Sequence, residues 1–354
     1  MTTVAEARRH FRPAPGYLNA ASLGLPPQDV VDTLTVELAR WQAGQADPLR
    51  YDAAVATSRE LFAGIVGVPA DRVAVGSQVS VLAGLVASSL PDGARVVCVE
   101  GDFSSVVFPF LVHADRGVTV RHVPRERLAE EVVAGTDLVA FSLAMSACGS
   151  VVDADSVVEA ASRVGALTMC DLTQAAGWMP VDASRFDITV TSAYKWLCSP
   201  RGTAFLTVRP EVADRLRPTS AGWYAGQDVW SSVYGPGMSL AQDARRFDVS
   251  PAWLCWAGTV PALRLFASLE AAAVRDYDAG LADALREGLG LAPAGRPVLS
   301  LEDADGSRVA RLREAGASVA ARAGKVRIAF HLWNDTDDVE LALKALRVAA
   351  PVGA

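Results

Sequence analysis

The chain contains few groups that can act as an amine nucleophile. Of its 33 basic residues only Lys195, Lys325 and Lys344 are lysines, and the other 30 are arginines. Lys344 follows Glu340 by four residues, a spacing typical of an exposed ion pair on a helix, and Lys325 lies in RAGKVRI, where a turn is expected. Lys195 instead follows the apolar run ITVTSAY, where burial lowers the pKa of an amine and makes it nucleophilic. Taken alone, Lys195 also fits an ordinary lysine at a strand end.

A carboxylate in a matching position is Asp171, which lies 24 residues before Lys195 at the end of the apolar run ALTMC. It opens the sequence D-L-T-Q, which ends at Gln174. Separately, Asp171 fits a helix N-cap and Gln174 a surface residue of that helix. Together with Lys195 they match the needs of pyridoxal phosphate: an amine that forms an imine, an anion that keeps the pyridine nitrogen protonated, and a donor to the phenolate oxygen of the ring.

The phosphate group of such a cofactor needs N–H donors at the start of a helix. Gly76, Ser77 and Gln78 supply a glycine, a hydroxyl and an amide just before the helix expected in VLAGLVASSL. Neither G-x-x-x-x-G-K-[ST] nor G-x-G-x-x-G occurs in the chain. A P-loop nucleotide-binding protein and a dinucleotide-dependent dehydrogenase are therefore not expected.

Strands and helices must bring these residues together. From residue 94 to residue 208, short apolar runs alternate with helical segments, which is the rhythm of β-α-β units. The runs are ARVVCVE, VTVRHV, TDLVAFSL, ALTMCDL, FDITVTS and TAFLTV. Because the runs are almost continuously apolar, we expect a mostly parallel sheet with helices on both faces. Ligands bind beyond the carboxyl ends of such strands, where Asp171 and Lys195 stand.

The flanking regions have a different character. Helices are expected over residues 28–43 and 53–66. Residues 219–248 are rich in glycine and aromatic residues and show no regular period, and their part 222–237 fits either a loop over a pocket or a subunit interface. Residues 315–347 predict two strands and a capped helix, as in a small α+β domain.

Composition excludes several classes of protein. With 354 residues, of which 51% are hydrophobic and 21% charged, the chain is globular and not disordered or collagenous. A net charge of -7 gives no electrostatic basis for nucleic-acid binding, and no membrane span or export signal is recognised. The five cysteines lack a C-x-x-C motif, which predicts reduced thiols and a cytoplasmic location. The four histidines lack the spacing of metal ligands, so no metal site is expected.

Four segments, in order and across nearly the whole chain, resemble the class V aminotransferase family of pyridoxal-phosphate enzymes. They are YLNAASLGLPP, GSQVS, DLTQAAGWMPVDASRFDITVTSAYKWLCSPRGTAFL and VRIAFHLWNDTDDVELALKAL. The resemblance implies fold type I of the pyridoxal-phosphate-dependent transferases, an α/β fold with a large, mostly parallel sheet domain and a small α+β domain. It implies a large cofactor-binding domain over 17–245, a small domain over 246–354 with the N-terminal arm 1–16, and a homodimer.

The resemblance also implies roles for single residues. Lys195 corresponds to the Schiff-base lysine, Asp171 to the partner of the pyridine nitrogen and Gln174 to the partner of the phenolic oxygen. The implied phosphate ligands are Ser77, Gln78, Ser192 and Tyr194. Phe103 resembles the residue that stacks on the cofactor ring in relatives, although it fits a core phenylalanine equally well.

Four further residues follow from the same resemblance. Arg327 matches the arginine that binds the α-carboxylate of the substrate, a role that suits its planar fork of donors. Asn19 is expected near the substrate. Arg246 lies in a segment that crosses the dimer interface in relatives, and Ser250 is expected to contact the phosphate of the neighbouring subunit.

The predicted reaction is a pyridoxal-phosphate reaction on a small-molecule amino acid, in which Lys195 takes up the α-proton. An aminotransferase-type reaction is favoured over a β-eliminating C–S lyase, and racemisation is a third outcome. A persulfide-forming cysteine desulfurase is not expected, because AARAGKVRIAF has neither the family's loop nor its cysteine, and Cys255 lies far back in the chain. A cofactor-free binding protein is the alternative from another class, which the intact set of Lys195, Asp171 and Gln174 opposes.

Overall fold

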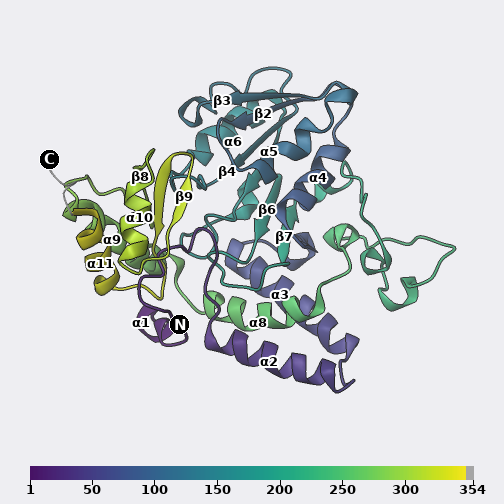
Figure 1. The fold of residues 1–354 in the computed structure, drawn as a ribbon. Coiled ribbons are helices and arrows are strands. Elements are labelled where there is room, and N and C mark those ends of the chain that lie inside the picture. Colours follow the sequence, from purple (N-terminus) through teal and green to yellow (C-terminus); the bar gives the residue numbers. More distant parts are fainter. Residues whose placement is uncertain (348–354) are drawn as a thin grey trace.

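A computed structural model describes residues 1–347, and a seven-stranded sheet forms its centre (Figure 1). The strands are β1 (Val73–Gly76), β2 (Arg95–Val99), β3 (Thr119–Val123), β4 (Leu138–Ser142), β5 (Leu167–Asp171), β6 (Ile188–Ser192) and β7 (Ala204–Val208). Their order is β1-β7-β6-β5-β4-β2-β3, and β7 runs in the direction opposite to that of the other six described strands. The predicted α/β class with a mostly parallel sheet is confirmed, and each of the six predicted runs contains one strand.

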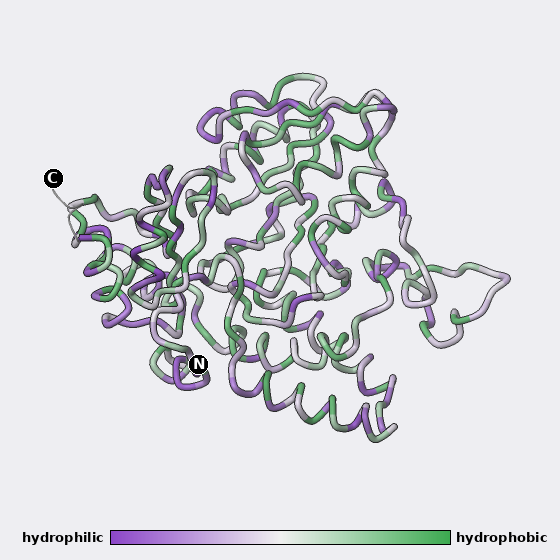
Figure 2. Tube along the Cα trace, viewed as in Figure 1, coloured by the Kyte–Doolittle hydropathy of each residue, from purple (hydrophilic) through white to green (hydrophobic). Residues whose placement is uncertain are grey.

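Both faces of the sheet are buried because alternate residues of its strands enter two different cores. Leu138 and Ala140 of β4 belong to the core beneath α4 (Val79–Ser89) and α5 (Ser104–Leu111). Val139 and Phe141 belong to the core beneath α3 (Pro48–Val66) and α6 (Ala154–Val164). Figure 2 shows these strands mainly in the hydrophobic colours. The double coverage explains why the runs are apolar throughout.

Three long helices, α2 (Gln28–Gln42), α3 and α8 (Trp253–Ala267), pack together and lie below the sheet in Figure 1. Helix α3 begins with Pro48 after the N-cap Asp47 and ends at Val66, before the C-cap Gly67, whose φ of 72° is left-handed. Phe62 of α3 stacks on Phe205 of β7 with ring centroids 4.0 Å apart, which fixes the helix to the sheet. In the described part of the chain no single helix is long and apolar enough to span a membrane, although the bent pair of α8 and α9 (Ala271–Gly288) passes by length and composition.

A second sheet of three antiparallel strands, β8 (Val298–Glu302), β10 (Lys325–Ala329) and β9 (Ala320–Arg322), lies beside the first. It shares a core with α9, α10 (Ser307–Glu314) and α11 (Thr336–Arg347). The N-terminal segment joins this sheet, because Tyr17 and Asn19 form bridges to Ser318 and Ala329. The two predicted strands and the capped helix of residues 315–347 are β9, β10 and α11. The predicted domain boundaries stay predictions.

The segment between β7 and α8 is irregular, as predicted. It contains α7 (Pro210–Ala213) and the short 3-10 turns η5 (Trp223–Ala225), η6 (Trp230–Ser232) and η7 (Ala244–Phe247). Part of this segment, drawn in green, projects from the body of the molecule (Figure 1). Trp230 Nε1 donates a hydrogen bond of 2.7 Å to Asp52 Oδ2, which ties η6 to α3. The remaining helical elements are α1 (Val4–Arg8), η1 (Ala70–Arg72), η2 (Ala114–Arg116), η3 (Arg125–Arg127) and η4 (Ala183–Arg185).

Candidate active site

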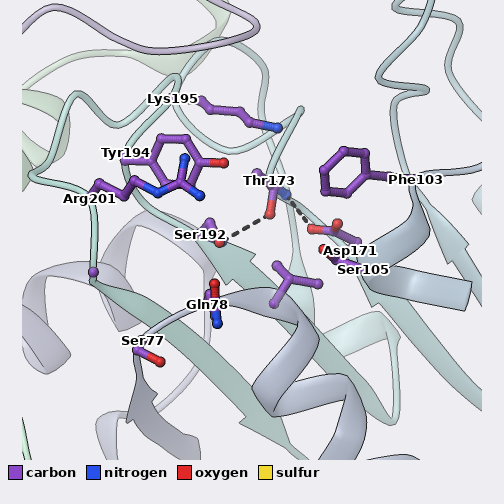
Figure 3. Close-up of a pocket in the computed structure, with 12 residues that line it drawn as sticks. Ser77, Gln78, Phe103, Ser105, Asp171, Thr173, Ser192, Tyr194, Lys195 and Arg201 are labelled. Atoms are coloured by element: carbon purple, nitrogen blue, oxygen red, sulfur yellow. Dashed lines mark hydrogen bonds between the residues drawn. The ribbon is translucent and has the colours of Figure 1, made fainter. Parts of the chain in front are cut away.

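Three neighbouring parallel strands end side by side on polar residues. Strand β4 ends at Ser142, β5 at Asp171 and β6 at Ser192. A cavity of about 250 Å³ lies beyond the ends of β5 and β6 (Figure 3). The predicted site residues that line it are Ser77, Gln78, Phe103, Asp171, Ser192, Tyr194 and Lys195. The topology therefore brings together residues that lie far apart in the sequence.

Lys195 stands on a tight turn between β6 and β7. Cys198 N donates to Lys195 O at 3.1 Å, and Cys198 itself has a left-handed φ of 52°, a conformation that costs a non-glycine residue roughly 1–3 kcal/mol. Gly24 N donates to Tyr194 O at 2.9 Å, and a Cβ on Gly24 would meet Lys195 O at 1.9 Å. The N-terminal segment thus clamps the turn, and the Lys195 side chain extends into the cavity (Figure 3).

Two buried groups of opposite charge share this cavity. The exposed fractions of Lys195 and Asp171 are 5% and 4%. Burial lowers the pKa of Lys195 to about 8; Asp171 opposes this shift, and Arg327 adds to it. Burial raises the pKa of Asp171 to about 6, against the effects of a 2.8 Å hydrogen bond from Thr173 N and of Lys195. The neutral amine required of a nucleophile is therefore accessible near neutral pH.

Another part of the cavity wall consists of hydrogen-bond donors. Helix α4 starts after Gln78 without a side-chain cap, so the N–H groups of its first turn are available to an anion. The hydroxyls of Ser77, Ser192 and Tyr194 and the guanidinium of Arg201 line the same space (Figure 3). The guanidinium carbon of Arg201 lies 4.9 Å from the centroid of the Tyr194 ring. A positive group, hydroxyls and a helix N-terminus suit a phosphate.

Phe103 stands at the mouth of the cavity as the N-cap of α5. Its ring centroid lies 5.0 Å from Lys195 Nζ, and it is 41% exposed, so it is not a core phenylalanine. The preceding residue, Asp102, holds this loop to the end of β4. Its Oδ1 accepts from Phe103 N at 2.7 Å and from Ser142 Oγ at 2.6 Å, and its Oδ2 accepts from Ser142 N at 2.8 Å.

Arg327 of β10 lies outside the lining of this cavity and is 1% exposed. Its Nη1 donates to Ser146 O at 2.5 Å and its Nη2 to Ser22 Oγ at 2.6 Å, whereas its buried Nε has no partner among residues 1–347. Arg322 Nη2 reaches the same Ser22 Oγ at 3.4 Å. Burial, and then Arg322, lower the pKa of Arg327 to about 10. Because no carboxylate pairs with Arg327 among residues 1–347, the arrangement favours an anionic ligand.

Gln174 is buried next to the cavity but does not line it. Its Oε1 accepts from Trp196 Nε1 at 2.7 Å, and its Nε2 donates to Ala21 O at 3.0 Å and to Ser146 Oγ at 3.1 Å. Ser146 also accepts from Arg327. In this structure the Gln174 amide therefore connects the surroundings of Arg327 to the residue that follows Lys195.

The other predicted residues lie farther from the cavity wall. Asn19 lies beside β10 through its bridge to Ala329, and its buried Oδ1 has no partner in the described part of the chain. Arg246 donates to Asp214 Oδ1 at 2.9 Å, and Ser250 is exposed. Neither of them, and no residue of 222–237, is among the described residues that line the cavity.

Sequence reasoning missed several residues of the site. Thr173 and Arg201 follow Asp171 and Lys195 closely, so their position just beyond a strand end was a usable signal. Thr173 Oγ1 accepts from Ser192 N at 2.9 Å and so ties the ends of β5 and β6 together. The meeting of Arg322 with Arg327 had no comparable signal, because it depends on the antiparallel pairing of β9 with β10.

Known proteins resemble this chain over most of its length, both in sequence and in fold. A family model described as Aminotransferase class-V matches residues 17–310. An uncharacterized aminotransferase YcbU of Bacillus subtilis is 28% identical over 306 residues, which are 81% of each chain. An isopenicillin N epimerase of Amycolatopsis lactamdurans is 32% identical over 245 residues, or 63% of this chain and 61% of the relative. The resemblance predicted from the sequence is confirmed.

Solved structures share the fold over nearly the whole chain. The cysteine desulfurase CsdA from Escherichia coli matches with a TM-score of 0.85 and 18% identity, covering 98% of both chains. The cystine C–S lyase C-DES, solved with its product cysteine persulfide, matches with a TM-score of 0.86 and 20% identity over 95% of this chain and 98% of that one. At such low identity these likenesses concern the fold alone.

Proposed function

Because this chain belongs to the class V aminotransferase family of pyridoxal-phosphate enzymes, we propose that it acts on an amino acid through Lys195 in a reaction of the aminotransferase type. One observation carries the proposal: the buried amine of Lys195 and the buried carboxylate of Asp171 line one cavity beyond the ends of β5 and β6. An amine of lowered pKa beside an acid is what this chemistry requires of a protein.

The residues around the cavity fit pyridoxal 5'-phosphate, the predicted cofactor, which family membership confirms. The uncapped start of α4, with Ser77, Ser192, Tyr194 and Arg201, offers donors for the phosphate group. Lys195 offers the amine. The chemistry of this donor set is that of a phosphorylated aldehyde site, since an anion cradle and a nucleophilic amine occur in one enclosed space.

When bound, pyridoxal phosphate draws electrons from the substrate carbon that carries the amino group. Lys195 holds the cofactor through Nζ and afterwards takes up and returns the α-proton at the same nitrogen. The Asp171 carboxylate keeps a proton on the pyridine nitrogen, and the ring of Phe103 shields one side of the site from water. Gln78 binds at the phosphate end through the start of α4.

Arg327 is proposed to bind the α-carboxylate of the substrate, with Asn19 beside it. The support for Arg327 is its buried guanidinium, which has no carboxylate partner among the described residues. A substrate carboxylate would balance the positive charge of this guanidinium and accept a hydrogen bond from its Nε–H. The unpartnered Oδ1 of Asn19 only accepts hydrogen bonds, so Asn19 would face the amino group of the substrate and not its carboxylate.

Gln174, whose amide joins Ser146 to Trp196, would hold this end of the site in register with Lys195. The resemblance also implies a hydrogen bond from Gln174 to the phenolic oxygen of the cofactor, for which Nε2 would have to exchange its bond to Ser146 Oγ or to Ala21 O.

Borohydride treatment of the purified protein followed by peptide mapping tests the role of Lys195. We expect the reduced cofactor on Lys195; an adduct on Lys325 or Lys344, or none at all, would contradict the proposal. The absence of any adduct would favour the cofactor-free binding protein.

Product analysis tests the reaction type. An aminotransferase converts its bound cofactor to the pyridoxamine form once and then waits for a keto acid. Continuous release of a keto acid, ammonia and a sulfur compound would instead indicate a C–S lyase. Inversion of the amino acid without other products would indicate a racemase.

A persulfide-forming desulfurase is disfavoured by the hairpin before Arg327. Strands β9 and β10 are joined by only two residues, Ala323 and Gly324, with φ of 48° and 72°, so the hairpin has no loop that could carry a cysteine. Cys255 Sγ contacts Arg201 O at 3.3 Å, and burial raises the pKa of this thiol, which weakens it as a nucleophile. We expect Cys255→Ser to keep its activity. Persulfide on Cys255, with loss of activity in the variant, would restore the desulfurase interpretation.

A homodimer is proposed as the working unit, with Arg246 and Ser250 directed at the partner as the family resemblance implies. Leu38, Trp41 and Leu49 leave large apolar side chains exposed on α2 and at the start of α3, and Trp41 also lines an apolar groove of about 490 Å³ with Trp253. Such a surface is typical of a subunit contact. Light scattering should give the mass of two chains for the wild type and a lower mass for Trp41→Glu.

A further inference from the structure

A second pair of buried titratable groups lies behind the turn that carries Lys195. His331 follows β10 and Asp278 lies on α9, and both residues are 0% exposed. His331 Nδ1 lies 2.6 Å from Asp278 Oδ2, and His331 Nε2 lies 2.9 Å from Trp196 O. Trp196 directly follows Lys195. A chain of hydrogen bonds therefore runs from the elements around the small sheet to the peptide next to the lysine.

The partners of His331 determine where the protons lie. A carbonyl oxygen only accepts, so Nε2, which faces Trp196 O, carries a proton. A second proton lies between Nδ1 and Asp278 Oδ2, and wherever it resides along that bond the pair as a whole is neutral. Asp278 Oδ1 is buried and has no partner among the residues that the structure describes, so loss of this proton would leave an uncompensated charge in the interior. The donor to Trp196 O is thus maintained.

Apolar rings enclose the pair. The imidazole stacks on Phe266 at 5.7 Å between centroids and meets Trp196 and Trp333 edge to face at 5.2 and 5.0 Å. The ring of His331 therefore cannot turn away from Trp196 O without displacing three aromatic side chains.

Two other titratable groups face the pair, namely Cys198 from the lysine turn and Tyr277 from α9. Burial raises the pKa of the Cys198 thiol well above its usual range and that of Tyr277 to about 12, so both stay neutral near pH 7. Tyr277 Oη donates away from the pair, to Asn334 O at 2.5 Å. The charge state of the pair is therefore set within the pair itself.

The turn that receives this hydrogen bond is strained and closely surrounded. Cys198 has a φ of 52°, and a Cβ on Gly177 would meet Trp196 O at 2.4 Å. The Trp196 carbonyl is thus packed against the backbone of Gly177 and accepts a hydrogen bond from His331. Strained backbone of this kind persists only where the surroundings fix it.

We infer that Asp278 and His331 form a positioning pair that fixes the Trp196 peptide and thereby holds the Lys195 amine at its place in the cavity. The inference rests on the proposed role of Lys195. A purely structural purpose does not require this pair, because apolar side chains of similar volume would fill the space without the cost of burying two titratable groups. The imidazole of His331 forms one hydrogen bond to Asp278 and one to Trp196 O, on the turn that carries Lys195.

Two substitutions of His331 separate positioning from packing. The amide nitrogen of a glutamine reaches the place of Nε2, whereas an asparagine amide ends near Nδ1. His331→Gln therefore keeps the donor to Trp196 O, and His331→Asn keeps the contact with Asp278 but loses that donor. The readout is the rate at which cofactor-free protein attaches added pyridoxal phosphate to Lys195, trapped with borohydride, beside the melting temperature of each variant.

We expect His331→Asn to attach the cofactor roughly a hundredfold more slowly, the effect of a small misplacement of a reacting group, and His331→Gln to stay near the wild-type rate. Equal rates in the two variants, or slowing that only follows the melting temperature, would overturn the inference. Failure of the wild type to attach the cofactor would count against the proposed function instead.

Asp278→Asn keeps the test decisive if the histidine variants do not fold. The asparagine amide can donate to Nδ1, which leaves the proton on Nε2 and preserves the bond to Trp196 O. We expect an attachment rate close to that of the wild type. A folded Asp278→Asn protein that attaches the cofactor a hundredfold more slowly would show that the pair does not act through position.

Discussion

Two parts of the site differ in how their charges are balanced. At the ends of β5 and β6, a carboxylate and an amine share one cavity, and Asp171 and Lys195 each favour the ionised form of the other. At the β9–β10 hairpin, Arg322 and Arg327 bring two cations to one hydroxyl, and Arg322 lowers the pKa of Arg327. The first part supplies both charges from the chain itself. The second is balanced only when an anion arrives from outside.

The difference fits the role that is proposed for each part. The cofactor stays with the protein, so its amine and acid are placed by the rigid ends of two paired strands. A substrate comes and goes, so an anchor such as the one proposed for Arg327 gains from a charge that remains unsatisfied until binding. A buried guanidinium without a carboxylate destabilises the empty protein and favours the complex.

Asp171→Asn breaks the balanced part and is expected to have the largest effect. A neutral amide cannot keep a proton on the pyridine nitrogen, so turnover should fall by roughly 10²- to 10³-fold. Cofactor binding should persist, because the phosphate donors and Lys195 remain, and Thr173 N can still donate to the amide oxygen. Steady-state kinetics and the absorbance of bound cofactor measure the two effects separately.

The matched control is Asp155→Asn on α6, where the carboxylate side chain is 84% exposed. It should leave turnover unchanged. Turnover near the wild-type value in Asp171→Asn would show that the carboxylate at the end of β5 has another purpose.

The part with balanced charges, Asp171 and Lys195, was also easier to predict from the sequence. Asp171 and Lys195 each follow a buried apolar run, and parallel strands end at one edge of the sheet, so their meeting follows from the β-α-β rhythm. Strands β2 to β7 were predicted for the same reason. The irregular segment 219–248 was recognisable from its glycines, but its projection away from the cavity depends on contacts such as that of Trp230 with Asp52.

The hairpin part was less predictable because it depends on contacts between distant segments. Arg327 meets Ser22 across 305 positions of the chain, and His331 meets Trp196 across 135. No local pattern encodes such pairings. The Gln174 side chain shows the same limit: its place in the sequence was informative, but its partners Trp196, Ala21 and Ser146 follow from tertiary packing.

Arg327→Lys tests the unbalanced part and should have an intermediate effect. A lysine keeps the charge but cannot form two parallel hydrogen bonds to a carboxylate. Loss of one charge-assisted bond, roughly 1.5–3 kcal/mol, should raise the KM of the substrate about 10- to 100-fold with little change in kcat.

Arg322→Lys is the comparison for this variant. Arg322 is exposed, so solvent screens its charge, and KM should rise only a few-fold. A larger effect for Arg322→Lys than for Arg327→Lys would assign the carboxylate to the exposed arginine.

The smallest effect concerns the stability of the cofactor-free protein as a function of pH. Burial raises the pKa of Asp171 from 3.8 to about 6, so between these values the folded protein binds a proton that the unfolded chain has lost. The stabilisation from this group is complete below about pH 4 and is lost as the pH rises through about 6, a change of roughly 3 kcal/mol at most. Asp171→Asn does not titrate, so its melting temperature relative to the wild type should rise by a few degrees across this range and then level off. If the difference in melting temperature between the two proteins stayed constant from pH 4 to pH 7, burial would not raise the pKa of Asp171.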